Sequence, residues 1–136
     1  MTLIEIFIFI IGHFIADFVL QDVEWAENKS TSNEALLMHT VTYSLFWLLL
    51  ALGIDVYVHV TTGYWAFEVL SVQKFVFYTF IFHTYTDYIT SRIVKRKFEK
   101  KQYGTHLPNL GAFTVIGFDQ VLHYLQLFIT YKLLSF

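Results

Sequence analysis

Residues 11–29 read IGHFIADFVLQDVEWAENK, and this stretch determines what we expect of the whole chain. It begins inside an apolar run and carries His13, Asp17 and Gln21 at steps of four residues. Such steps place side chains on one stripe of a helix. An ionisable residue in a membrane-spanning helix is costly, so by default it faces the protein interior and is functional. The stretch therefore predicts one wall of a polar site inside a helical membrane protein.

The composition is typical of a membrane protein rather than of a soluble domain. Of the 136 residues, 56% are hydrophobic and 15% are charged, whereas roughly 25% charged is usual. A soluble fold of this size cannot bury so much apolar surface. No signal-peptide pattern is visible, so the first apolar segment is expected to remain as a span. The absence of cysteine excludes disulfides, thiolate metal sites and thiol nucleophiles.

Four apolar segments are long enough to cross a bilayer core, for which about 20 residues suffice. We expect an all-α fold, a single domain over residues 1–136 in which four transmembrane helices form an antiparallel bundle. The predicted spans are residues 3–21, 34–52, 74–92 and 111–134. The first helix is expected to run on through Trp25 and Ala26. The second is expected to begin in a capping box of Thr31 and Glu34 and to end at Gly53.

The connections on either side of the third span differ in character. Residues 65–73 are expected to form a short interfacial piece before it or to continue the third span. A basic extension follows it and is expected to end at Gly104. In the loop beyond, Asn109 is the expected cap of the fourth span, and His106 is expected to be solvated.

Lysine and arginine are distributed unevenly among the connections. Six of the nine basic residues lie within residues 92–101, whereas residues 53–64 contain none. The positive-inside rule then places loops 22–33 and 92–110 in the cytoplasm and both termini outside. The lipid bilayer is the expected partner, with residues 92–101 in contact with anionic lipids. No nucleic-acid partner is expected, because no second basic patch supports one.

With this topology, seven ionisable side chains converge in one layer. The helical rise places them at depths of roughly 6 to 18 Å from the cytoplasmic face. They are His13, Asp17, His39, His83, Asp87, Asp119 and His123. Three of the four spans carry a histidine and an aspartate four residues apart, and the second span contributes a single histidine.

Imidazoles and carboxylates together are suitable ligands for Zn, Mn or Fe. We therefore interpret the seven side chains as ligands of a divalent metal, with Asp87 and Asp119 as the catalytic residues. Gln21 and Gln120 are expected to support the site through hydrogen bonds. No phosphate-binding loop, serine-nucleophile motif or HExxH is present, so an enzyme built this way would use a metal-activated water. The predicted function is a metal-dependent hydrolase of a lipid or other membrane-associated substrate.

Two readings without catalysis stay open. The same polar layer suits a proton- or cation-conducting unit, which would be a homo-oligomer because four spans enclose little. It also suits a purely structural membrane protein, for instance one encoded by a phage.

Five motifs resemble those of a known family. They are GHFIADFVLQ, the W-A-x-x-K after it, a lone histidine in the second span, HTYTDY and FDQVLHY. In this order they resemble the bacterial and phage membrane proteins grouped as domain of unknown function 3307. The resemblance implies recurring polar residues at His13, Asp17, Gln21, Lys29, His39, His83, Asp87, Asp119, Gln120 and His123, and it adds Lys29 as a supporting residue. A weaker similarity connects the His/Asp-rich spans to small membrane metal-dependent hydrolases, which carry paired histidines near the N-terminus where this chain has His-Asp.

Overall fold

The computed structural model describes residues 1–104 and 110–134, and every regular element in these ranges is helical. The elements are α1 (Leu3–Phe14), a π-helical turn η1 (Ile15–Val19), α2 (Val23–Asn28), α3 (Asn33–Thr62), α4 (Val69–Glu99) and α5 (Ala112–Leu133). The prediction of an all-α fold is confirmed. The expected cap Asn109 and the loop residue His106 lie outside the described residues.

The first predicted span is interrupted rather than continuous. After α1, the amide of Leu20 bonds to the carbonyl of Ile15 at 2.9 Å, five residues back, which closes the π-helical turn. The chain then bends, and the Asp22 side chain accepts hydrogen bonds from the amides of Glu24 and Trp25. An aspartate that caps a new helix ends the preceding one, so the expected continuous helix through Trp25 and Ala26 is wrong.

Helix α3 is longer than its predicted span. Its N-cap is Ser32, whose hydroxyl accepts from the amide of Ala35, rather than Thr31. The helix also continues through Gly53 to Thr62 and ends at Gly63, whose φ of 77° is the left-handed conformation that glycine adopts readily. The prediction of an end at Gly53 is wrong, because one glycine inside a helix costs only about 1 kcal/mol relative to alanine.

Helix α4 also extends beyond its predicted limits. It begins at Val69, so residues 69–73 continue the helix of the third predicted span. The short connection before it is tied to α3 by Asp55, which accepts from the amides of Ala66 and Phe67. The helix ends at Glu99 rather than at Gly104, and Lys101, at φ 53°, takes the left-handed position after it.

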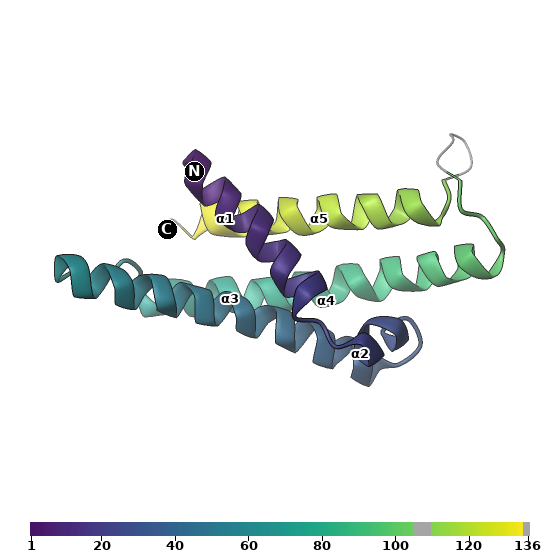
Figure 1. Cartoon of the computed structure of the whole chain (residues 1–136), viewed down its shortest axis with the longest axis horizontal. Helices are drawn as coiled ribbons and strands as arrows, with labels where there is room; N and C mark the ends of the chain where they lie inside the picture. The colour runs from purple at the N-terminus through teal and green to yellow at the C-terminus, as the bar shows by residue number, and fades with distance from the viewer. Residues whose placement is uncertain (105–109, 135–136) are drawn as a thin grey trace.

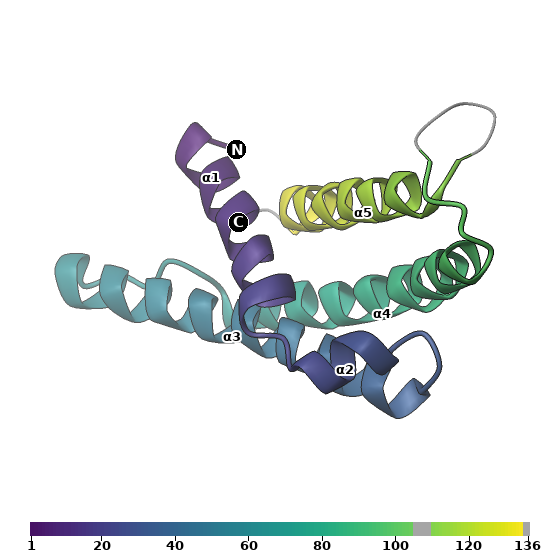
Figure 2. The same cartoon turned by 45° about the vertical axis from the view of Figure 1, so that its right-hand side comes forward.

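The three long helices lie side by side and α1 crosses them obliquely (Figures 1 and 2). Helix α4 packs between α3 and α5, while α1 rests on α5 and the π-helical turn rests on α3. Short connections between consecutive helices make α3 and α4, and likewise α4 and α5, antiparallel (Figure 1). The steep crossing of α1 differs from the regular bundle that the sequence predicts.

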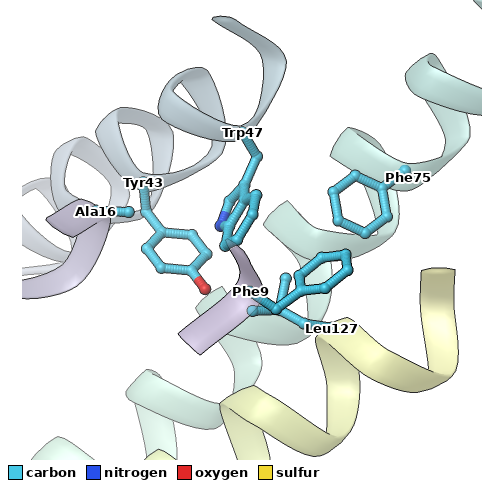
Figure 3. Packing of buried hydrophobic residues seen from close by; sticks show 6 residues of the cluster. All are labelled: Phe9, Ala16, Tyr43, Trp47, Phe75 and Leu127. Carbon is cyan, nitrogen blue, oxygen red and sulfur yellow. The ribbon is translucent and has the colours of Figure 1, made fainter. Parts of the chain in front are cut away.

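An aromatic core fills the space where α1 meets the long helices. Figure 3 shows its buried members, which are Phe9, Ala16, Tyr43, Trp47, Phe75 and Leu127. The Phe9 ring lies 5.3 Å from the ring of Trp47 and 6.1 Å from that of Phe75. Gly12 allows this approach, because a Cβ there would meet the Trp47 ring at 2.9 Å. The core therefore fixes where α1 crosses and, through it, the position of the π-helical turn.

By length and composition, α3 and α5 can cross a membrane. In the most apolar 18-residue window of each, only 17% and 22% of the residues are buried within the chain. The core helix of a soluble protein would be mostly buried, whereas most of the apolar surface of α3 and α5 faces outward from the chain. The remaining two predicted spans do not meet the same test among the described residues.

Replacing Phe9 with alanine should remove the centre of the aromatic core. A buried Phe→Ala change costs about 3 to 5 kcal/mol of unfolding free energy. The matched control is Phe7→Ala on the same helix, because Phe7 is 54% exposed. Denaturant titration of the detergent-purified variants compares the two, and equal losses would contradict the packing described above.

Candidate metal centre

Seven buried polar side chains from α1, the π-helical turn, α3, α4 and α5 meet in one cluster, which we call the His/Asp cluster. Its members are His13, Asp17, His39, His83, Asp87, Asp119 and His123. All four histidines are at most 1% exposed, and the most exposed aspartate, Asp119, is 9% exposed. The structure thus brings together every residue that the sequence predicts for the polar layer.

Asp87 lies at the centre of the His/Asp cluster. Its Oδ2 is 2.9 Å from Nε2 of His39, and its Oδ1 is 3.2 Å from Nε2 of His123. The Lys29 ammonium donates to Oδ2 at 2.7 Å. The two oxygens of one carboxylate therefore face two different sets of nitrogen atoms.

Asp17 reaches the cluster from a different segment, the π-helical turn. Its Oδ1 is 3.2 Å from Nε2 of His39 and 3.7 Å from Nε2 of His83. This oxygen is buried and has no hydrogen-bond partner. The Nε2 atoms of His39 and His83 are 3.2 Å apart. A buried acceptor that faces two imidazole nitrogens without a hydrogen bond suits a shared cation.

Ring stacking orients His83. Its ring stacks on Tyr43, with centroids 3.8 Å apart, and on His123, with centroids 4.1 Å apart. The Nδ1 atoms of His83 and His123 have no hydrogen-bond partner. These two rings are therefore oriented by aromatic contacts and by the contacts of Nε2, whereas metal-binding histidines more often use a hydrogen bond from the second nitrogen.

His13 and Asp119 lie at the edge of the cluster, and their polar atoms are hydrogen bonded to other side chains. His13 is hydrogen bonded through Nδ1 to the Tyr43 hydroxyl at 2.9 Å and through Nε2 to Oε1 of Gln120 at 2.8 Å. Gln120 in turn donates to Asp119, which also accepts from the Thr90 hydroxyl. Asp119 Oδ2 is 3.4 Å from Nε2 of His123. These bonds connect the outer residues to the centre.

Within the described residues, two overlapping groups of three side chains could hold a metal ion. One is Asp17, His39 and His83, and the other is His83, Asp87 and His123. In each group the ligand atoms lie within 4.8 Å of one another. Five of the seven predicted ligands belong to these groups, whereas His13 and Asp119 do not. Because His83 is shared, the groups describe neighbouring positions in one centre.

Charge balance also favours a cation. Burial by itself would lower the pKa of the Lys29 ammonium, but the carboxylates of Asp87 and Asp17 outweigh it and raise the pKa above its usual value. Lys29 is therefore a cation at neutral pH. It is one positive charge beside a cluster that contains three aspartates. A divalent ion or protonated imidazoles would supply the remaining positive charge.

A cavity of about 440 Å³ gives access to the cluster from one side. Carboxylates of the cluster form its floor, and apolar and basic side chains form its walls. Its lining includes Asp17, Asp87, Asp119, Phe18, Gln21, Lys29, Lys95, Phe98 and Ile116. Through this cavity a molecule of modest size can reach the buried carboxylates.

The supporting residues fall into two kinds. Gln120 and Lys29 bond directly to cluster members. Gln21 lines the cavity, but its Oε1 makes no hydrogen bond, because the bend after the π-helical turn removes it from the stripe of His13 and Asp17.

Sequence reasoning missed Tyr43 and Thr90. Tyr43 is fully buried, bonded to His13 and stacked on His83. It lies four residues after His39, so the same spacing that identified the other residues contains the signal. Thr90 follows Asp87 by three residues and carries the equivalent signal.

These features define an all-helical protein whose buried histidines and aspartates form a candidate metal centre at the base of a cavity. Residues 6–136 match the family described as "Protein of unknown function (DUF3307)", and the chain belongs to that family. The predicted family is confirmed. No curated protein and no solved structure matches the chain.

Replacing Lys29 with methionine in metal-free buffer should destabilise the protein. The change leaves Asp87 buried without its cation, and removing one partner of a buried ion pair costs about 3 kcal/mol or more. In an Asp87→Asn background the same replacement should cost far less, because the charge to be balanced is gone. Denaturant titration of the four proteins measures the coupling, and additive losses would contradict the pairing.

Proposed function

We propose that this protein is an integral membrane, metal-dependent hydrolase that acts on a lipid or membrane-associated ester or amide. The observation that carries the proposal is the convergence of five imidazole and carboxylate ligands at the base of a cavity. Buried carboxylates need positive charge beside them, and a divalent cation would supply it in addition to Lys29.

In this proposal residues 1–136 form one four-helix membrane domain. Helices α3 and α5 cross the bilayer, and α4 and the α1–η1 segment complete the bundle between them. The exposed apolar surface of α3 and α5 supports this arrangement. The basic end of α4 faces the cytoplasm and both termini lie outside, as the positive-inside rule expects. The His/Asp cluster then lies near the cytoplasmic face.

Each residue of the cluster has a role in the proposal. Zinc, manganese or iron is held by Asp17, His39, His83, Asp87 and His123. Asp119 is the general base, because it lines the cavity beside His123 without belonging to either ligand group. His13 positions the site through its bonds to Tyr43 and Gln120. A divalent ion in such a site supplies a nucleophilic water at neutral pH.

A proton- or cation-conducting unit is the second candidate. Its support is the chain of adjacent imidazoles, with His39 and His83 in contact and His83 stacked on His123. Against it, the charged side chains give way beyond the cluster to the aromatic core of Phe9, Trp47 and Phe75, where the buried hydroxyls of Thr79 and Ser44 are neutral. Ion flux into liposomes that disappears in Asp119→Asn would favour conduction over hydrolysis.

Elemental analysis of the detergent-purified protein tests the proposed function. The wild-type protein should retain a stoichiometric amount of zinc, manganese or iron. His83→Ala should lose it, since His83 belongs to both ligand groups. His59→Ala is the control, because His59 stacks on Trp65 away from the cluster and should leave the metal content unchanged. A folded wild-type protein without any transition metal would overturn the proposal.

A further inference from the structure

A second cavity adjoins the cavity above the His/Asp cluster. The second cavity has a volume of about 310 Å³ and is lined by Ser30, Arg92, Lys95, Arg96 and Glu99. Ser30 and Lys95 also line the cluster cavity. The two spaces therefore share a wall, and we call the second one the basic rim.

The basic rim and the floor of the cluster cavity carry opposite charges. Three cationic side chains and one carboxylate line the rim, whereas the floor carries three aspartates. Lys95 and Glu99 are only loosely paired, at 3.9 Å, and both are largely exposed. The surplus of positive charge at the rim is therefore available to a ligand.

The two arginines of the rim complement each other. Arg92 is held in place, since its guanidinium donates to Asn33 and to the Tyr88 carbonyl and lies over the Tyr88 ring. Among the described residues the Arg96 side chain makes no ion pair or hydrogen bond. Guanidinium groups match the oxygens of a phosphate with two parallel hydrogen bonds. The rim thus combines Arg92, which hydrogen bonds hold in place, with Lys95 and Arg96, which are not held in this way.

Apolar side chains line the cluster cavity together with its charged residues. They include Phe18, Val94, Phe98 and Ile116. Phe18 is 51% exposed and Phe98 is 41% exposed, so the apolar wall is open to the surroundings. A ligand that fits has an apolar chain and an anionic end.

We propose that the two joined cavities bind a phosphate-bearing lipid, with the phosphate at Lys95 and Arg96 and the acyl chain along Phe18 and Phe98. Lys95 lies eight residues after Asp87 on α4, about 12 Å along the helix axis. This spacing keeps the phosphate clear of the aspartates on the floor. That the bound lipid is also the substrate rests on the proposed function. The rim binds the head group of one lipid molecule specifically. This differs from the general attraction of basic residues to an anionic membrane surface.

Binding of a single-chain phosphate lipid tests this inference. Lysophosphatidic acid, monoacylglycerol of the same chain length and inorganic phosphate are titrated into the protein in a non-ionic detergent, with calorimetry as the readout. The wild-type protein should bind lysophosphatidic acid roughly tenfold more tightly than monoacylglycerol. The double variant Lys95→Gln, Arg96→Gln should lose this preference. The control is Lys100→Gln, Lys101→Gln, which removes two charges outside both cavities and should keep it.

Several results would overturn the inference. If both double variants lost the preference for lysophosphatidic acid equally, the rim would act only through the overall positive charge of this region. Inorganic phosphate that binds as tightly as the lipid would remove the role of the apolar wall. Monoacylglycerol that binds as tightly as lysophosphatidic acid would remove the role of the phosphate and of the basic rim. Metal content separates the two proposals: a wild-type protein that discriminates between the lipids but holds no metal refutes only the hydrolase, whereas a metal-loaded protein without discrimination refutes only the lipid site.

Discussion

The carboxylate of Asp87, buried among two imidazoles and an ammonium, is the contact on which the rest of the structure depends. A carboxylate is costly to bury unless cations and hydrogen bonds surround it. Here the partners come from three separate segments: Lys29 from the end of α2, His39 from α3 and His123 from α5. Helix α4 supplies Asp87 and lies between α3 and α5, so all of these elements must meet at one depth.

The molecule is divided into a polar and an aromatic half. Below the His/Asp cluster, Phe9 packs among Trp47 and Phe75 and closes the interior. Above it, the cavity opens toward the basic end of α4. The π-helical turn links the two halves, because it follows the packed part of α1 and carries Asp17 into the cluster. Such turns recur at functional sites because the wider turn reorients one side chain. A cavity that opens onto the cluster suits chemistry on a bound molecule.

Much of the fold and the site followed from residue spacing, and what was missed has physical reasons. Steps of four residues identified the histidines and aspartates, because an α-helix places such residues on one face. The π-helical turn at Ile15–Val19 was missed, since a single wider hydrogen bond leaves no mark on the hydrophobic pattern. The continuation of α3 past Gly53 was missed because the cost of one glycine is small compared with the tertiary contacts of a long helix. Tyr43 was missed although its spacing from His39 matched that of the polar residues.

X-ray absorption at the K edge of the bound metal tests the central claim most directly. It reports the ligands themselves, independently of any activity. If the His/Asp cluster is a metal centre, the spectrum shows scattering from more than one imidazole together with oxygen ligands, and His83→Ala reduces the imidazole contribution. A spectrum with oxygen ligands alone, or one unchanged by His83→Ala, would contradict the account.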